Sequence, residues 1–167
     1  VIVDLGFSQT QVVPFHNAAI VESNTAQINL GGFHLTQQLG KWLAEKGYEG
    51  SFELNFIRQI KEQYCFVRPF GENVEKNEEE AFIYSFEDNQ FRLGEERWKL
   101  AELYFFKNFF AKRVSQCPRL LSTGEKVAKE DFTLTSVVGT VIQSLDSNLW
   151  KAMFNNICLT GGGCLLY

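Results

Sequence analysis

The chain opens with VIVDLG, residues 1–6, an apolar run that ends in an acid and a glycine. This pattern predicts a short buried strand, and strand character returns over residues 9–15 after a tight turn. We call residues 4–9 the acid–glycine turn. A carboxylate such as Asp4 can order the water ligands of Mg²⁺, and a glycine such as Gly6 lets backbone N–H groups approach phosphate oxygens. Taken alone, Asp4-Leu5-Gly6 also fits an ordinary turn.

A second glycine turn lies near the other end of the chain. Residues 153–159 lead into a short predicted strand, which is followed by Gly161, Gly162 and Gly163. We call residues 161–163 the three-glycine turn. Because three glycines remove every Cβ from the backbone, a flat ring or a phosphate can approach closely, although a permissive turn explains them equally. Parallel α/β sheets bind ligands at the carboxyl ends of their strands, where both turns are predicted.

Helices and a hairpin are predicted between these turns. The expected elements are a strand at 25–30 closed by Gly31-Gly32, helices at 35–46, 52–66 and 133–145, an aromatic helical segment at 98–110, and hairpin strands at 81–86 and 89–93. Gly47 follows the first helix, as glycines commonly do, and Ser51 is the expected N-cap of the second. The second helix carries Lys61 and Glu62, whose long side chains can reach an adenine edge and ribose hydroxyls. In isolation, a solvated helix face is the simpler interpretation of this pair.

Composition argues against several other classes of protein. There are 16 basic and 20 acidic residues, a net charge of −4, so a cationic surface for nucleic acid is not expected. No apolar run reaches the roughly 18 to 20 residues that span a bilayer. The four cysteines form no CxxC pair, which predicts no zinc site, and Cys65 and Cys158 are expected to be buried. No Walker loop, G-x-S-x-G or HExxH motif is present.

Five segments, taken in order, resemble actin and the actin-related proteins. They match the family's second phosphate loop and following strand (3–14), its next strand-to-helix turn (28–36), its adenosine-facing helix (57–67), the return to the larger lobe (94–103) and the adenosine-side glycine turn (155–162). The resemblance implies the α/β, actin-like (ribonuclease H-like) nucleotide-binding fold, represented by its C-terminal half and therefore incomplete. Residues 1–30 and 95–167 would form the inner domain (subdomain 3-like), and residues 31–94 the smaller inserted lobe (subdomain 4-like).

The resemblance also implies a site for ATP or ADP with Mg²⁺. Asp4 would hold the metal through water, and the residues expected to bind the nucleotide are Asp4, Gly6, Gly32, Lys61, Glu62, Gly161, Gly162 and Gly163. Several family residues are replaced: Leu5 stands for a serine, Phe7 for an acid and Ser8 for a glycine. Gln11 stands at the position of the water-positioning histidine, so no catalytic residue is assigned and weak hydrolysis is expected. Without the family's first half, the chain alone should bind nucleotide poorly and show no significant ATPase activity.

The function implied is that of a divergent actin-related protein. It would bind ATP as a structural or scaffold subunit of a chromatin-remodelling, dynactin-like or cytoskeletal complex. Expected partners are other protein subunits, with actin and other actin-related proteins among them, and neither nucleic acid nor a membrane. The implied location is inside the cell, in cytoplasm or nucleus. Two alternatives remain: a filament-forming actin-like ATPase, and a nucleotide-free pseudo-actin whose aromatic surface contacts partners through Phe105, Phe106, Phe109 and Phe110.

Overall fold

The computed structural model describes residues 1–48, 53–68, 82–86, 89–106, 114–116 and 133–165. They form two compact units, each with its own apolar core. The first unit comprises Val1–His34 and Leu103–Leu165, and the second comprises Leu35–Glu102. These boundaries fall a few residues after those expected at 30 and 94, and the division into an inner domain and an inserted lobe stays a prediction.

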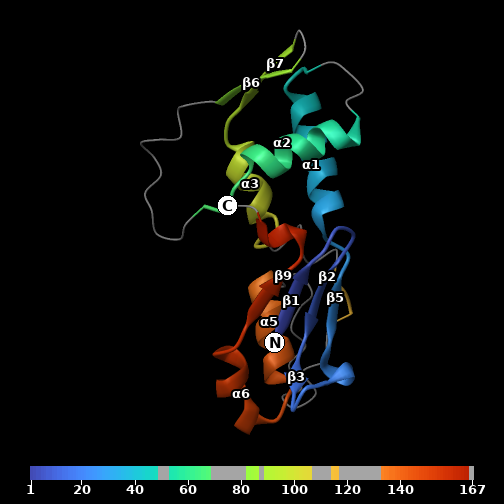
Figure 1. Cartoon of the computed structure of the whole chain (residues 1–167), viewed down its shortest axis with the longest axis vertical. Helices are drawn as coiled ribbons and strands as arrows, with labels where there is room; N and C mark the ends of the chain where they lie inside the picture. Colours follow the sequence, from blue (N-terminus) through green and yellow to red (C-terminus); the bar gives the residue numbers. More distant parts are fainter. Residues whose placement is uncertain (49–52, 69–81, 87–88, 107–113, 117–132, 166–167) are drawn as a thin grey trace. The chain divides into compact units, whose positions relative to one another are not determined.

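The first unit is a mixed sheet with helices (Figure 1). Its elements are β1 (Ile2–Leu5), β2 (Thr10–Val13), β3 (Phe15–His16), β4 (Ala19–Ile20), the 3₁₀-helix η1 (Glu22–Asn24), β5 (Ala26–Ile28), β8 (Val114–Gln116), α5 (Leu134–Gln143), α6 (Ser147–Phe154), β9 (Cys158–Thr160) and the 3₁₀-helix η4 (Gly162–Leu165). The main sheet has the strand order β8-β5-β2-β1-β9, in which only the β1–β9 pair is parallel among the described strands.

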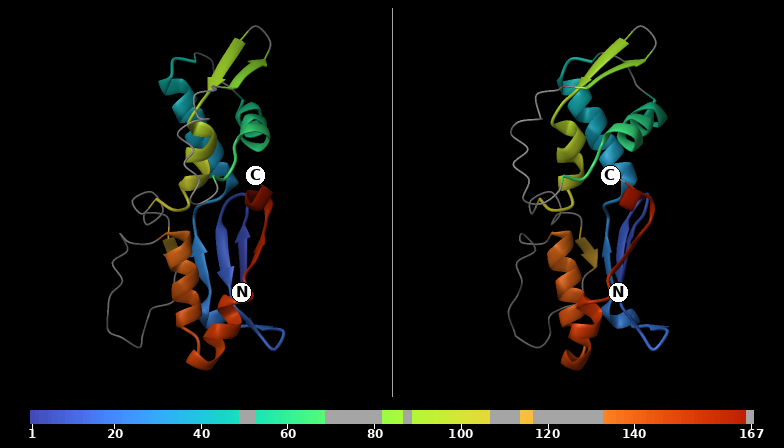
Figure 2. Two further views of the ribbon diagram at one scale, coloured as in Figure 1. Left: turned by 90° about the vertical axis from the view of Figure 1, so that its left-hand side faces the viewer. Right: turned by 60° about the vertical axis from the view of Figure 1, so that its left-hand side comes forward.

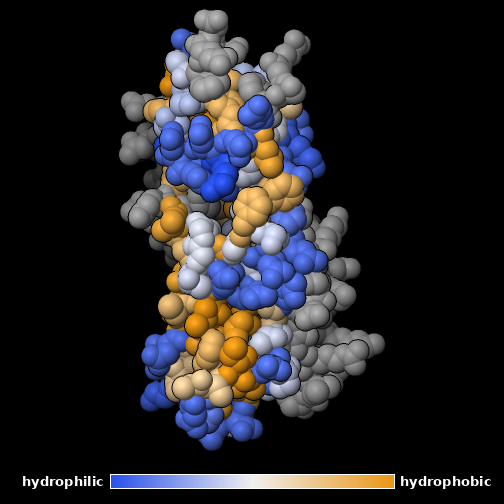
Figure 3. Space-filling model, turned by 45° about the vertical axis from the view of Figure 1, so that its right-hand side comes forward, coloured by the Kyte–Doolittle hydropathy of each residue, from blue (hydrophilic) through white to orange (hydrophobic). Residues whose placement is uncertain are grey.

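The two faces of this sheet differ because successive side chains of a strand point in opposite directions. Val3 pairs with Val12, and both are buried. Helix α5 lies against β2 (Figure 2), and Val137 and Val141 of this helix are buried. The partially exposed side chains of Asp4 and its register partner Gln11 belong to the opposite face. On the surface, hydrophobic side chains lie exposed beside hydrophilic ones in the lower part of Figure 3, where the first unit is drawn.

The second unit combines helices with a hairpin. Its elements are α1 (Gly32–Glu45), whose first turn belongs to the first unit, α2 (Leu54–Tyr64), β6 (Phe82–Phe86), β7 (Asn89–Leu93) and α3 (Glu96–Glu102). Leu35, Leu39 and Leu43 recur every four residues along α1 and are fully buried, which confirms the predicted helical spacing. Gly47 follows this helix with φ +83°, as predicted for a residue just past a helix end. The predicted hairpin is also confirmed.

Three details of the predicted elements are wrong. The helix expected to start after Ser51 begins at Leu54, and Glu53 occupies the N-cap position without a capping side chain. Helix α6 was not predicted from the sequence as a separate element. Cys65 is buried as predicted, but Cys158 is exposed, as are the other residues of β9, the last strand in the order of the described strands. Residues 107–110 of the aromatic segment lie outside the described residues. None of the helices in the described part of the chain is long and apolar enough to cross a membrane.

Candidate functional site

The acid–glycine turn and the three-glycine turn lie next to each other in the first unit. They follow the parallel neighbours β1 and β9, in which Asp4 is the register partner of Thr160. A Cβ atom added to Gly161 would lie 2.4 Å from Asp4 Oδ1 and 2.6 Å from the Leu5 carbonyl oxygen. The backbone of one turn therefore touches the carboxylate of the other. The carboxyl ends of two adjacent parallel strands thus meet at one point, as the sequence led us to expect.

The three-glycine turn offers open backbone on its outer side. Gly161 has φ +88°, a left-handed conformation that favours glycine, whereas a Cβ on Gly162 would meet no atom within 4 Å. Gly162 is also exposed. An oxyanion or a flat ring can therefore reach the peptide groups around Gly162, while Gly161 fixes the close contact with Asp4.

The acid–glycine turn is built from backbone hydrogen bonds. The Gly6 N–H donates to the Gln9 carbonyl oxygen at 3.0 Å. The first amides of α1 then bond to the turn: Gly32 N–H donates to Gly6 O at 3.0 Å, and Phe33 N–H to Phe7 O at 2.8 Å. Because Gly32 is buried and its amide is used in this way, it holds the shape of the turn.

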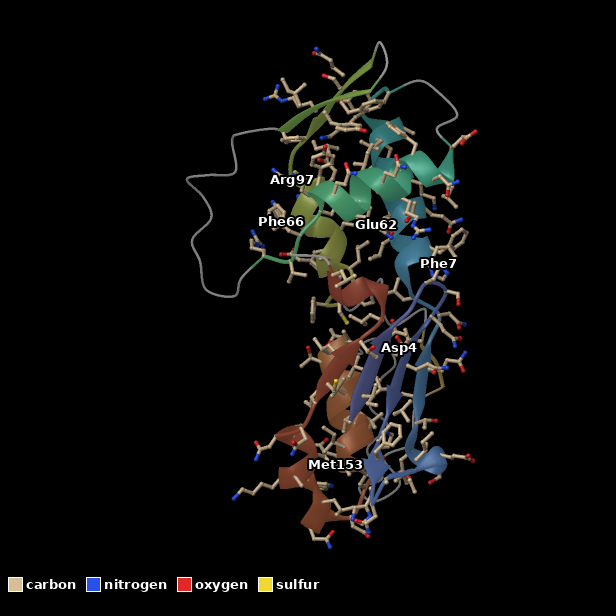
Figure 4. All side chains as sticks on the ribbon, in the orientation of Figure 1. Asp4, Phe7, Glu62, Phe66, Arg97 and Met153 are labelled. Atoms are coloured by element: carbon tan, nitrogen blue, oxygen red, sulfur yellow. The ribbon has the colours of Figure 1, made fainter. Side chains whose placement is uncertain are left out.

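The residues that replace family residues in this turn have distinct environments. The Leu5 side chain is buried in the core, whereas Phe7 is 59% exposed and lies against the ring of Phe33 with centroids 5.7 Å apart. Gln11 is the register partner of Asp4, so the two side chains share one face of the sheet. Figure 4 shows Asp4 and Phe7 at the same end of the β1–β2 pair. A neutral amide therefore lies beside the carboxylate, and an aromatic ring forms the tip of the turn.

Lys61 and Glu62 lie on α2 in the second unit and have different environments. Lys61 is 5% exposed, and burial lowers its pKa, although the charge of Glu62 opposes this shift. Glu62, labelled in Figure 4, is exposed and accepts a hydrogen bond from Arg58 Nε at 2.8 Å. A buried cation is costly unless it is paired and hydrogen-bonded. The role of this pair beside the two turns stays a prediction.

Sequence reasoning missed two residues at the turns. From the sequence, Gly31 only closes a predicted strand, yet a Cβ there would lie 2.6 Å from Phe7 O and 2.7 Å from Gly6 O. Tyr104 is buried close to Gly163, whose added Cβ would lie 3.5 Å from the Tyr104 hydroxyl. The adjacent glycines were a signal for the first residue, because close backbone approach is a common reason for glycine. No sequence pattern distinguished Tyr104 from the aromatic residues around it.

An α/β sheet with glycine turns at the carboxyl ends of adjacent parallel strands is typical of ligand-binding α/β proteins. The model of the Actin family matches residues 1–167, and the chain belongs to this family. It has the actin-like fold that the five ordered segments predicted.

A relative within this family is Actin-related protein 2 of Schizosaccharomyces pombe (strain 972 / ATCC 24843). The two are 25% identical over 172 residues, which cover 99% of this chain. The chain spans 40% of the length of that relative. The similarity therefore concerns only a part of the relative and does not establish the activity of a whole protein of this kind.

Proposed function

We propose that the protein is an actin-related protein that binds ATP with Mg²⁺ as a structural subunit of a larger protein assembly. The observation that carries this proposal is the contact of Asp4 with the three-glycine turn across the β1–β9 pair. A carboxylate suits the water ligands of Mg²⁺, and backbone without Cβ atoms suits phosphate or a base. Both features belong to the first unit.

Each residue of the proposed site has a defined task. Asp4 holds Mg²⁺ through water, and the peptide groups of Gly6 and of residues 161–163 surround the nucleotide. Lys61 and Glu62 contact the adenosine, and Gly32 supports the acid–glycine turn through its bond to Gly6 O. A nucleotide that binds only the folded protein stabilises it by mass action. We propose that this is its main effect.

We propose that hydrolysis is weak. Gln11, beside Asp4, carries an amide that cannot accept a proton as a general base does. Leu5 directs an apolar side chain into the core, and Phe7 adds a ring where phosphate-binding loops carry small or polar groups. A site of this kind binds nucleotide but hydrolyses it slowly. This favours a scaffold role over a filament-forming ATPase.

The proposed partners are other protein subunits. Actin and other actin-related proteins are the first candidates, because the chain belongs to the Actin family and resembles Actin-related protein 2. A chromatin-remodelling, dynactin-like or cytoskeletal complex in the nucleus or cytoplasm would provide them. Nucleic acid and membranes are not proposed as direct partners, in keeping with the net charge of −4.

Nucleotide analysis of the intact protein, purified with its native partners, tests the proposal. We expect acid extraction to release about one adenine nucleotide per protein, and added ATP to be hydrolysed more slowly than by conventional actin. Lys61→Gln should weaken Mg-ATP binding roughly tenfold or more, because hydrogen bonds from charged groups are the stronger ones. Lys41→Gln changes an exposed cation on α1 and serves as the control, with affinity unchanged.

Three outcomes would contradict this proposal. Absence of nucleotide from the intact protein would favour the nucleotide-free pseudo-actin. Rapid hydrolysis together with ATP-dependent sedimentation would favour the filament-forming ATPase. Equal affinities for Lys61→Gln and Lys41→Gln would remove Lys61 from the site.

A further inference from the structure

The Tyr104 hydroxyl is a buried polar group with no role among the residues proposed to bind the nucleotide. The Tyr104 side chain is 4% exposed, and its hydroxyl has no hydrogen-bond partner among the described residues. A buried hydroxyl that is left unpaired costs free energy, whereas phenylalanine would fill the same space without that cost. We therefore look for a hydrogen-bond acceptor that could approach the hydroxyl in another conformation of the protein.

Thr10 lies close to the Tyr104 hydroxyl, but the two hydroxyls do not meet in hydrogen-bonding geometry. The Thr10 hydroxyl donates its own proton to the Leu30 carbonyl oxygen at 2.7 Å. Burial raises the pKa of Tyr104 to about 12, and the nearby Thr10 hydroxyl opposes this shift only in part. The Tyr104 side-chain hydroxyl itself has no partner in hydrogen-bonding geometry in the described part of the chain. Tyr104 therefore keeps its proton at neutral pH and is available as a donor.

The backbone of the three-glycine turn lies within reach of this donor. A Cβ on Gly163 would lie 3.5 Å from the Tyr104 hydroxyl and 3.0 Å from the Leu5 carbonyl oxygen. Tyr104 itself is anchored, since its carbonyl oxygen accepts a hydrogen bond at 2.9 Å from the amide of Leu134, the first residue of α5. The three glycines have the widest backbone freedom of any residue type. Gly161 is held against Asp4, but Gly162 has open space around it, so this part of the turn can adjust toward the hydroxyl.

We propose that Tyr104 is a positioning residue for the three-glycine turn and donates its hydroxyl proton to a backbone carbonyl of that turn when a nucleotide is bound. The inference rests on the proposed function. Tyr104 does not touch the nucleotide and acts through the turn. The hydroxyl is unsatisfied in the free protein and satisfied in the complex. This difference contributes to affinity and selects the turn conformation that fits the ligand.

Tyr104→Phe in the full-length protein tests this role against Tyr48→Phe. Tyr48 is the matched control because its hydroxyl, in the second unit, accepts a hydrogen bond from the Arg92 amide at 2.6 Å. We expect Tyr104→Phe to leave the Tm of the free protein unchanged or higher and to raise the Kd for Mg-ATP roughly 3- to 10-fold, the effect of one hydrogen bond. Tyr48→Phe should lower the Tm and leave the Kd unchanged.

Amide hydrogen exchange supplies a readout that a purely structural role would not move. Nucleotide should protect the amides of residues 161–163 in the wild type and protect them less in Tyr104→Phe. An unchanged Kd and unchanged protection in Tyr104→Phe would overturn this inference while leaving the proposed function intact. A Tm loss as large as that of Tyr48→Phe would overturn it too, because the hydroxyl would then be paired in the free protein. Failure of the wild type to bind Mg-ATP would instead refute the proposed function.

Discussion

Gly161 combines two constraints that only glycine meets together. Its φ of +88° lies in the left-handed region, where a Cβ costs free energy. The same Cβ would lie 2.4 Å from Asp4 Oδ1 and 2.6 Å from the Leu5 carbonyl oxygen, far closer than real Cβ contacts. The contact between the two turns therefore depends on a missing side chain.

Gly161→Ala should destabilise the protein by about 2–4 kcal/mol, because backbone strain and a backbone clash add together. Gly162→Ala lies one residue away in open space and should cost less than about 1 kcal/mol. Denaturant unfolding of the two variants beside the wild type measures both changes. Equal losses would show that the close approach of Gly161 to Asp4 does not contribute to stability.

Sequence pattern identified the glycines of the turns but not all of their contacts. Gly161 and Gly6 could be singled out because each directly follows a predicted strand, where α/β proteins bind ligands. The need for glycine at position 31 depends on Phe7 O and Gly6 O, which belong to a turn more than twenty residues earlier in the chain. Such a contact exists only after β1, β2 and β5 have paired. Local sequence therefore could not reveal it.

Glu96 joins the ends of three elements in the second unit. It lies in the first turn of α3, pairs with Lys46 just after α1, and accepts a hydrogen bond from Gly94 N–H, after β7, at 2.8 Å. Burial alone would raise the pKa of Glu96, but the Lys46 and Gly94 hydrogen bonds outweigh it and lower the pKa below its usual value. The folded state therefore favours the charged carboxylate.

A lowered carboxylate pKa gives stability that is present above the unfolded-state pKa, near 4.3 for glutamate, and is lost as the pH falls through the folded-state value. Glu96→Gln should reduce the free energy of unfolding by about 1 kcal/mol at pH 7, a modest value because Lys46 is partly exposed and screened. This deficit should disappear below the folded-state pKa of Glu96. Urea unfolding from pH 7 to pH 3 measures it, with Glu45→Gln, an exposed change on α1, as control.

A deficit of the same size at every pH would refute the electrostatic role of Glu96 and indicate a packing role instead. Stability lost equally by Glu45→Gln would show that the effect belongs to net charge rather than to this contact.

Elements with strong periodicity were predicted well, and those without it were not. The leucine spacing of α1 and the alternation of β6 and β7 come from burial of one face, so their sequences carry the signal. Helix α6 spans only Ser147–Phe154 and buries Met153 alone, so no apolar stripe indicates it. All three residues of β9 are exposed, Cys158 among them, although they belong to an apolar run that predicts burial.

The intact protein should gain stability from its ligand. The chain spans 40% of the length of its relative, so we expect the full-length protein to be needed for tight binding. Mg-ATP at one hundred times its Kd should raise the free energy of unfolding by about 2.7 kcal/mol. A thermal scan with Mg-ATP, with Mg²⁺ alone, and with ATP plus EDTA measures this gain and the share due to the metal.

Only the Mg-ATP sample should show the full rise in Tm, because Asp4 is proposed to act through Mg²⁺ and not directly on phosphate. An equal rise with ATP plus EDTA would contradict that role of Asp4. No rise in any sample would contradict nucleotide binding as a whole.

Family membership was predictable because five segments matched in order across the chain, although no single segment was decisive. The chain is 25% identical to Actin-related protein 2 over 172 residues. The departures at Phe7 and Gln11 could be read from the sequence, but their burial and contacts could not.

The acid–glycine turn is tied to α1 by the carbonyl oxygens of Gly6 and Phe7. The bond to Phe7 O is made by main-chain atoms and does not depend on which side chain position 7 carries. Positions 7 and 8 can therefore accumulate substitutions during evolution while the loop keeps its outline. Changes of side chain at these two positions therefore need not weaken the fold.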